Sequence, residues 1–157
     1  MGKSSTSGGR RRSETGASAV EFALVVPILI ILVFGVISFG MIFGQQLALG
    51  NAAREASRFG VVEGRTCAQV IGAARDAANT IGMSGSNVTV TVTRGASAAA
   101  AASNNVCNVT TANPCKSSAV GESLFVKLEF TSKVDIPLVI TKDIGLTSDG
   151  VFRCEYA

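Results

Sequence analysis

Residues 22–43 read FALVVPILIILVFGVISFGMIF, and this apolar stretch decides the fold class of the chain. No charged residue occurs between Glu21 and Arg54. As a helix, its 22 residues rise about 33 Å at roughly 1.5 Å per residue, enough to cross a hydrocarbon layer of about 30 Å. The apolar core of a cleaved secretory signal has only about 7 to 15 residues. We therefore expect a single membrane-spanning helix.

A basic leader precedes the apolar stretch. Residues 1–16 read MGKSSTSGGRRRSETG and hold the whole net charge of +3, through Lys3, Arg10, Arg11 and Arg12 against Glu14. Positive charge next to a span stays cytoplasmic, so everything after residue 43 is expected outside the cytoplasm. The leader is rich in glycine and serine and has no hydrophobic period, which predicts disorder. The expected location is a cell membrane, in single-pass topology.

The rest of the chain predicts a small α+β domain. The helix is expected to continue as an amphipathic stalk over 45–62 and to end at Gly64. The following 63–157 region, about 95 residues, is long enough for one modest core. Apolar periodicity predicts a helix over 66–81 and strands over 88–93, 124–130 and 150–156, which we expect to form an antiparallel sheet. Residues 95–121 are expected to form a long loop. The stretch at 136–140 contains Pro137 and is expected to form an edge strand or a loop.

Four cysteines fall in the part placed outside the cytoplasm. They are Cys67, Cys107, Cys115 and Cys154, and no two form a C-x-x-C pair. Oxidation is expected there, so disulfides fit better than a zinc site or free thiols. Of the three possible connectivities we favour Cys107 with Cys115, which closes the long loop, and Cys67 with Cys154.

Composition argues against an enzyme. The chain has no histidine, which removes the commonest general base and metal ligand. It also lacks a phosphate-binding glycine loop and paired carboxylates at a useful spacing. Outside the leader there is no basic cluster, so nucleic acid is a poor partner. We expect no catalytic residue, no cofactor, no metal and no small-molecule substrate.

Several residues in and beside the apolar stretch are candidates for assembly. Gly35, Gly40 and Gly44 offer a small-residue face on which another helix could pack. Pro27 predicts a tolerated kink. Glu21 begins the apolar span, where an acidic group is either a functional residue with a partner or a headgroup-layer charge favoured by the helix N-terminus.

The local sequence around Glu21 favours the functional alternative. Residues 16–22 read GASAVEF, follow the basic leader and run directly into the span, which resembles a class IV prepilin processing site. The wider pattern, ETGASAVEFAL at 14–24, then Pro27, then NAAREASRF at 51–59, resembles the TadE-like family. That family comprises minor pilins or pseudopilins of the Tad (tight adherence, Flp) pilus system, which is class IVb prepilin-like.

The resemblance implies a specific set of roles. A prepilin peptidase of the bacterial plasma membrane would cut after Gly16 and leave Ala17 as the new N-terminus, with Glu21 as its fifth residue. Glu21 would then pair with the α-amino group of Ala17 on a neighbouring subunit. The implied partners are membrane lipid, the peptidase, other pilins or pseudopilins and the pilus assembly machinery, in the plasma membrane or in a surface pilus.

Two functions therefore stand side by side at this stage. The first is a structural pilus subunit built from a cleaved leader (1–16), a transmembrane helix and stalk (17–62) and an extracytoplasmic domain (63–157). The alternative is an unprocessed, signal-anchored envelope protein with an extracytoplasmic binding or adhesion domain. The residues from Gly16 to Glu21 distinguish the two, since only the first needs a processing site.

Overall fold

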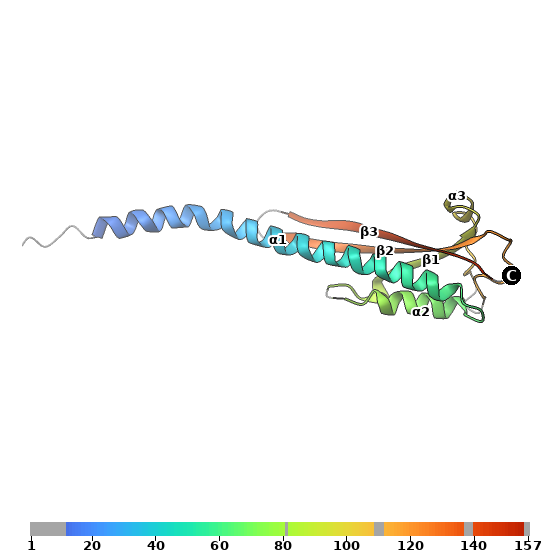
Figure 1. The fold of residues 1–157 in the computed structure, drawn as a ribbon. Helices are drawn as coiled ribbons and strands as arrows, with labels where there is room; N and C mark the ends of the chain where they lie inside the picture. The colour runs from blue at the N-terminus through green and yellow to red at the C-terminus, as the bar shows by residue number, and fades with distance from the viewer. Residues whose placement is uncertain (1–11, 81, 109–111, 137–139, 156–157) are drawn as a thin grey trace, which may run out of the picture.

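The protein consists of one long helix and a small α+β domain built along its second half (Figure 1). A computed structural model describes residues 12–80, 82–108, 112–136 and 140–155, with only the backbone described at 12–15, 135–136 and 140. The elements are α1 (Arg12–Gly60), α2 (Cys67–Ala77), the 3-10 turn η1 (Gly85–Asn87), β1 (Thr89–Gly95), α3 (Ala98–Ala101), β2 (Ser123–Ile136) and β3 (Ile140–Arg153). The expected α+β class is confirmed.

Helix α1 is apolar and exposed in its first half and packed in its second. It includes Pro27 and a segment with the length and composition of a membrane span. The backbone is helical from Arg12, so the prediction of disorder is wrong for residues 12–16, while residues 1–11 lie outside the described part. Once a helix exists, each added residue gains a backbone hydrogen bond, which favours extension of the span into the leader.

The sheet is a three-stranded antiparallel meander in the order β1-β2-β3. Strand β1 pairs with the first half of β2, from Gly95 opposite Ser123 to Thr89 opposite Glu129. Strands β2 and β3 pair along their full length, from Ser123 opposite Arg153 to Ile136 opposite Ile140. This long hairpin lies alongside α1 and points toward the bare half of the helix (Figure 1).

Several expected boundaries move. Strand β2 reaches six residues beyond the predicted 124–130, and β3 begins at Ile140 rather than at 150. Helix α2 stops at Ala77 instead of continuing to 81, because Thr80 and Met83 pair across a turn in which Gly82 has a φ of +77°. The predicted 95–121 loop contains the short helix α3. Of the 136–140 stretch, residues 137–139 lie outside the described part.

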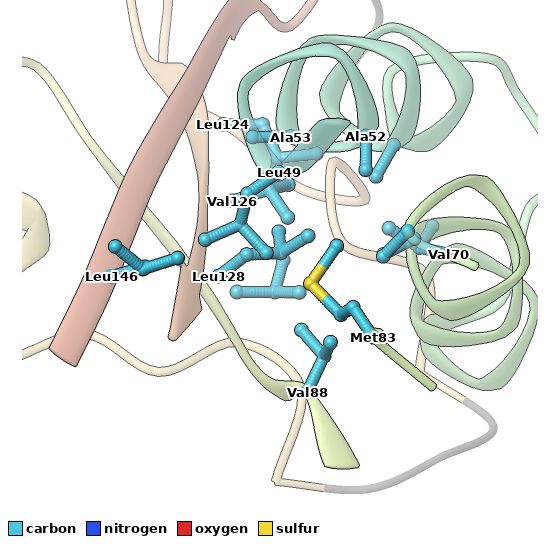
Figure 2. Close-up of a cluster of buried hydrophobic side chains, with 14 of the residues drawn as sticks. Leu49, Ala52, Ala53, Val70, Met83, Val88, Leu124, Val126, Leu128 and Leu146 are labelled. Carbon is cyan, nitrogen blue, oxygen red and sulfur yellow. The ribbon is translucent and has the colours of Figure 1, made fainter. Parts of the chain in front are cut away.

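One hydrophobic core joins the second half of α1 to α2 and the sheet. Leu49, Ala52, Ala53 and Ala56 of α1 are fully buried, and Figure 2 shows the first three facing a cluster from the other elements. That cluster comprises Val70, Met83, Val88, Leu124, Val126, Leu128 and Leu146. The expected stalk is thus covered along one face by its own domain.

The sheet approaches α1 very closely at Gly150 of β3. A side-chain carbon there would overlap the carbonyl of Ala53 and would lie 2.6 Å from the Ser57 hydroxyl oxygen. Ser57 is fully buried, and its hydroxyl donates to the Arg54 carbonyl at 3.0 Å. Small residues on both surfaces therefore let strand and helix backbones meet.

Candidate processing and assembly site

The predicted processing residues lie on the first turns of α1. Gly16, Ala17 and Glu21 are all exposed. An added side-chain carbon at Gly16 would meet nothing within 4 Å. Ala17 and Glu21 are four residues apart on a continuous helix, so they share one face. The structure therefore brings these two residues together and leaves the face that carries them uncovered.

The exposed surface continues through the apolar span. Every described side chain from residue 16 to residue 37 is exposed or, at Val26 and Gly35, half-buried. Phe22, Ile28 and Val36 each expose about two thirds of their surface, at 69%, 67% and 66%. A bare apolar helix of this size is costly in water, so lipid or other apolar helices must cover it.

The three candidate packing glycines do not share one face. Gly40 and Gly44 are four residues apart and line a groove of about 390 Å³ together with Ile37, Met41, Gln45 and Thr80. Gly35 precedes Gly40 by five residues, which rotates it about 140° around the helix. An added side-chain carbon at any of the three would meet nothing within 4 Å. Gly40 and Gly44 thus line one notch in the helix surface, and Gly35 lies on a different face.

Gln45 is a residue of this notch that the sequence analysis missed. Its side chain is 4% exposed, and its amide nitrogen donates to the Gly82 carbonyl at 3.1 Å. Its amide oxygen is buried and has no hydrogen-bond partner among the residues that the structure describes. Gln45 also lines a larger cavity of about 840 Å³ between α1 and the β2–β3 hairpin. Gln45 is the first residue with a long polar side chain after the apolar run at 22–43. This position could have identified it as a candidate, but hydrophobic periodicity does not consider single polar residues.

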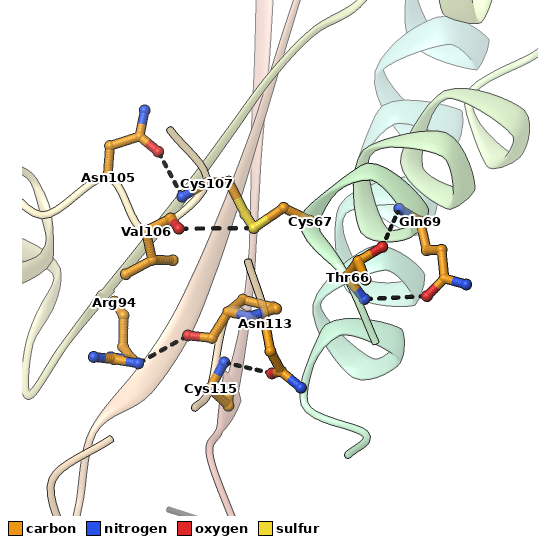
Figure 3. Close-up of a disulfide and its surroundings, with 10 residues drawn as sticks. Thr66, Cys67, Gln69, Arg94, Asn105, Val106, Cys107, Asn113 and Cys115 are labelled. Atoms are coloured by element: carbon orange, nitrogen blue, oxygen red, sulfur yellow. Dashed lines mark hydrogen bonds between the residues drawn. A yellow bond between two sulfur atoms is a disulfide. The ribbon is translucent and has the colours of Figure 1, made fainter. Parts of the chain in front are cut away.

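All four cysteines form disulfides, but not in the pairing we favoured. The bonds join Cys67 to Cys107 and Cys115 to Cys154, with Cα atoms 5.4 Å and 5.7 Å apart. The first bond ties the N-terminus of α2 to the long connection, as Figure 3 shows. The second ties the same connection to the segment that follows β3. The expected bonds Cys107–Cys115 and Cys67–Cys154 are therefore wrong.

Local contacts explain the observed pairing. The amide of Cys67 donates to the carbonyl of Ala112 at 2.7 Å, which lays the long connection across the start of α2. The backbone amide of Cys154 donates to the backbone carbonyl of Glu122 at 3.0 Å. Cys115, the disulfide partner of Cys154, is fully buried. Each bond links residues 39 or 40 apart in sequence. In the chain-entropy model, closing a loop of this length stabilises the folded state by about 4 kcal/mol for each bond.

Arg94 of β1 holds the rest of the long connection. Its guanidinium lies 3.0 Å from the Glu122 carboxylate and donates to the carbonyls of Pro114 and Lys116 at 3.0 and 2.9 Å. Thr66 and Gln69 form a reciprocal capping box at the start of α2 (Figure 3). These contacts stabilise the end of the domain that carries the disulfides.

These features define a class: a protein in which the described residues include one N-terminal apolar helix long enough to cross a membrane, and the second half of this helix packs into the core of a small disulfide-bonded α+β domain. Residues 16–58 match the family model TadE, described as TadE-like protein. The match confirms the resemblance to the TadE-like family that residues 14–24 and 51–59 predict. It begins at Gly16 and ends two residues before the end of α1. The search of curated proteins and the search of solved structures found no match.

Proposed function

We propose that this chain is a structural subunit, a minor pilin or pseudopilin, in the biogenesis of a Tad-type pilus. A prepilin peptidase removes residues 1–16, and the freed helix packs against the helices of other pilins. The main support for the proposal is that the TadE-like match begins at Gly16, which is also the first residue of the exposed part of α1 at 16–37. We further propose that the leader is cytoplasmic, that the domain lies outside the plasma membrane and that the chain has no catalytic activity.

Glu21 has the central part in this assembly. A carboxylate within an apolar helix needs a positive partner, and residues 22–53 hold no charged side chain. Cleavage creates one, because the α-amino group of Ala17 has a reference pKa of about 7.7 to 8.0 and is largely protonated near neutral pH. Pairing within one chain would lower the cost of insertion. Pairing with a neighbouring subunit would also drive assembly.

The first experiment tests processing. Coexpression with a prepilin peptidase should give a mature chain that begins at Ala17, read by N-terminal sequencing. Gly16→Val should abolish cleavage, whereas the matched control Gly9→Val in the same leader should leave it intact. A chain that keeps its leader with an active peptidase would instead support the signal-anchored binding protein.

The second experiment tests the role of Glu21. Glu21→Ala should be inserted and cleaved normally yet fail to co-purify with partner pilins, with at least a tenfold loss. Glu21→Asp should retain part of the assembly because it keeps the charge with a shorter reach. Glu14→Ala is the control, since it removes an acidic residue that cleavage discards. Wild-type assembly by Glu21→Ala would reduce Glu21 to a helix-end charge.

A further inference from the structure

The two disulfides join the cysteines in the order in which they occur along the chain. Cys67 pairs with Cys107 and Cys115 pairs with Cys154, at sequence separations of 40 and 39 residues. In the two other possible connectivities, one bond would enclose the other or the two bonds would overlap. Only in the observed pairing can one bond be complete before the third cysteine, Cys115, has been synthesised.

An unfolded chain with all four thiols free would favour a different bond. Cys107 and Cys115 are eight residues apart, whereas Cys67 and Cys107 are 40 residues apart. Because the probability of closing a flexible loop falls as about the −3/2 power of its length, the short loop closes about tenfold more often. Random oxidation of the complete chain would therefore join Cys107 to Cys115, although each has a different partner in the structure.

The completed fold buries the cysteines away from any enzyme. Cys67 and Cys115 are fully buried, and Cys154 is 8% exposed. Pro114, next to Cys115, is also fully buried, and its carbonyl accepts a hydrogen bond from Arg94 at 3.0 Å. Thiol–disulfide exchange requires access to the attacking thiolate, which burial prevents. We therefore expect both bonds to form before the long connection between β1 and β2 packs over them.

We propose that the domain is a substrate of an extracytoplasmic thiol oxidase, an enzyme with a reactive disulfide, which oxidises the cysteines in chain order during export. Cys67 and Cys107 are joined before Cys115 emerges, and Cys115 is then joined to Cys154. The inference rests on the proposed location of the domain outside the plasma membrane. It does not depend on cleavage by a prepilin peptidase or on pilus assembly.

Each bond forms in two thiol–disulfide exchange steps. The thiolate of Cys67 attacks the disulfide of the oxidase, which gives a mixed disulfide and frees one oxidase thiolate. The thiolate of Cys107 then attacks the sulfur atom of Cys67, forms the Cys67–Cys107 bond and releases the second oxidase thiolate. The two cysteines lose two protons and two electrons, and the oxidase disulfide takes up both to become a dithiol. A second oxidised enzyme molecule joins Cys115 to Cys154 in the same way.

The order of appearance gives the first bond an advantage in time. Cys115 follows Cys107 by eight residues, which takes about 0.4 to 1.6 s at a synthesis rate of roughly 5 to 20 residues per second. Cys67 precedes Cys107 by 40 residues, so its mixed disulfide has about 2 to 8 s to form at the same rate. Cys107 is then the first thiol that can resolve it. This lead offsets the tenfold advantage of the short loop.

Removal of Cys107 distinguishes oxidation in chain order from pairing directed by the fold. The full chain with Cys107→Ala is produced in a bacterial host that has a thiol oxidase but lacks a disulfide isomerase, a prepilin peptidase and partner pilins. Free thiols are alkylated, and the bonds are mapped in non-reduced peptides by mass spectrometry. Oxidation in chain order should join Cys67 to Cys115, in at least threefold excess over Cys115–Cys154. A predominant Cys115–Cys154 bond with Cys67 free would overturn the proposal.

Cys154→Ala is the matched control, because both routes join Cys67 to Cys107 and leave Cys115 free in this variant. The unmodified chain should carry both native bonds in the same host. Deletion of the oxidase should lower the amount of these bonds at least tenfold, measured by pulse labelling directly after synthesis. Native bonds that form at the same rate without the oxidase, or that form only when a disulfide isomerase is present, would refute the proposal.

The unmodified chain also separates this inference from the proposed function. If all four cysteines stay reduced in the host that has the oxidase, the domain lies in the cytoplasm, and the proposed orientation fails together with the inference. If the native bonds form but Cys107→Ala follows the fold-directed route, only oxidation in chain order fails. Because the host has no prepilin peptidase and no partner pilin, these results are independent of the proposed processing and assembly.

Discussion

The first half of α1 is apolar and the second half is amphipathic, and the two use different residues for their surroundings. The bare half, residues 16–37, is rich in Val, Ile, Leu and Phe side chains, which are mostly exposed. The packed half, residues 38–60, buries Ala52, Ala53, Ala56 and Ser57, with Leu49 as the one large aliphatic side chain fully buried there. Bulk suits contact with lipid, whereas small residues let a sheet approach the helix. Side-chain size therefore distinguishes the two surroundings better than hydrophobicity.

Both disulfides lie in the α+β domain that packs on residues 38–60 of α1. Their loss should therefore affect the domain and this half of the helix, and not residues 16–37. The double variant Cys115→Ala with Cys154→Ala should lower the free energy of unfolding of the domain by about 4 kcal/mol. Hydrogen exchange in detergent, followed by mass spectrometry, should accelerate at residues 49–56 and stay unchanged at 24–34. Peptide mapping without reduction should recover Cys67–Cys107 and Cys115–Cys154, and a Cys107–Cys115 peptide would contradict the structure.

A leucine in each half gives a direct contrast. Leu49 is fully buried and Leu29 is 51% exposed. Leu49→Ala should destabilise the domain by about 2 to 5 kcal/mol because it opens a cavity in the core. Leu29→Ala should change the unfolding free energy by less than about 0.5 kcal/mol. Equal effects, measured by urea unfolding in the same detergent, would mean that the two halves are not the separate environments described above.

Two glycines of β3 test how closely the sheet packs on the helix. Gly150→Ala should cost about 1 to 3 kcal/mol of stability, because the new methyl group overlaps the Ala53 carbonyl. Gly145→Ala on the same strand meets nothing within 4 Å and should be nearly neutral. Thermal unfolding of the two variants, compared with the unmodified chain, measures the difference. A neutral Gly150→Ala would indicate a wider gap between β3 and α1.

The elements with strong apolar signals were predictable from the sequence, and the others were not. The apolar run at 22–43 predicted α1, and the alternation of apolar and polar residues in 88–93 and 124–130 predicted β1 and half of β2. Apart from the strand predicted over 150–156, which contains the last four residues of β3, the remainder of the hairpin gave no such signal, because Ser132 and Ser148 occupy positions that face or approach the helix. Small residues at those positions remove hydrophobic alternation although the strand continues. Tertiary packing on α1 therefore decides the strand length.

The candidate site divides in the same way. Gly16, Ala17 and Glu21 were identified from a contiguous motif, which a sequence displays directly. Gln45 was missed because its burial depends on Gly82, 37 residues further along the chain. The disulfide pairing was missed for a similar reason, since the contact between Cys67 and Ala112 determines which cysteines meet. Contacts between segments that are distant in the sequence produce no local sequence pattern, so they could not be predicted.

The continuity of α1 has a mechanical consequence. The helix runs without a break from Arg12 to Gly60, about 73 Å at 1.5 Å per residue, and its second half is the core of the domain. No hinge lies between the crossing segment and the domain within this helix. A tilt or axial rotation of the part of α1 that follows Pro27 must therefore turn the domain through the same angle.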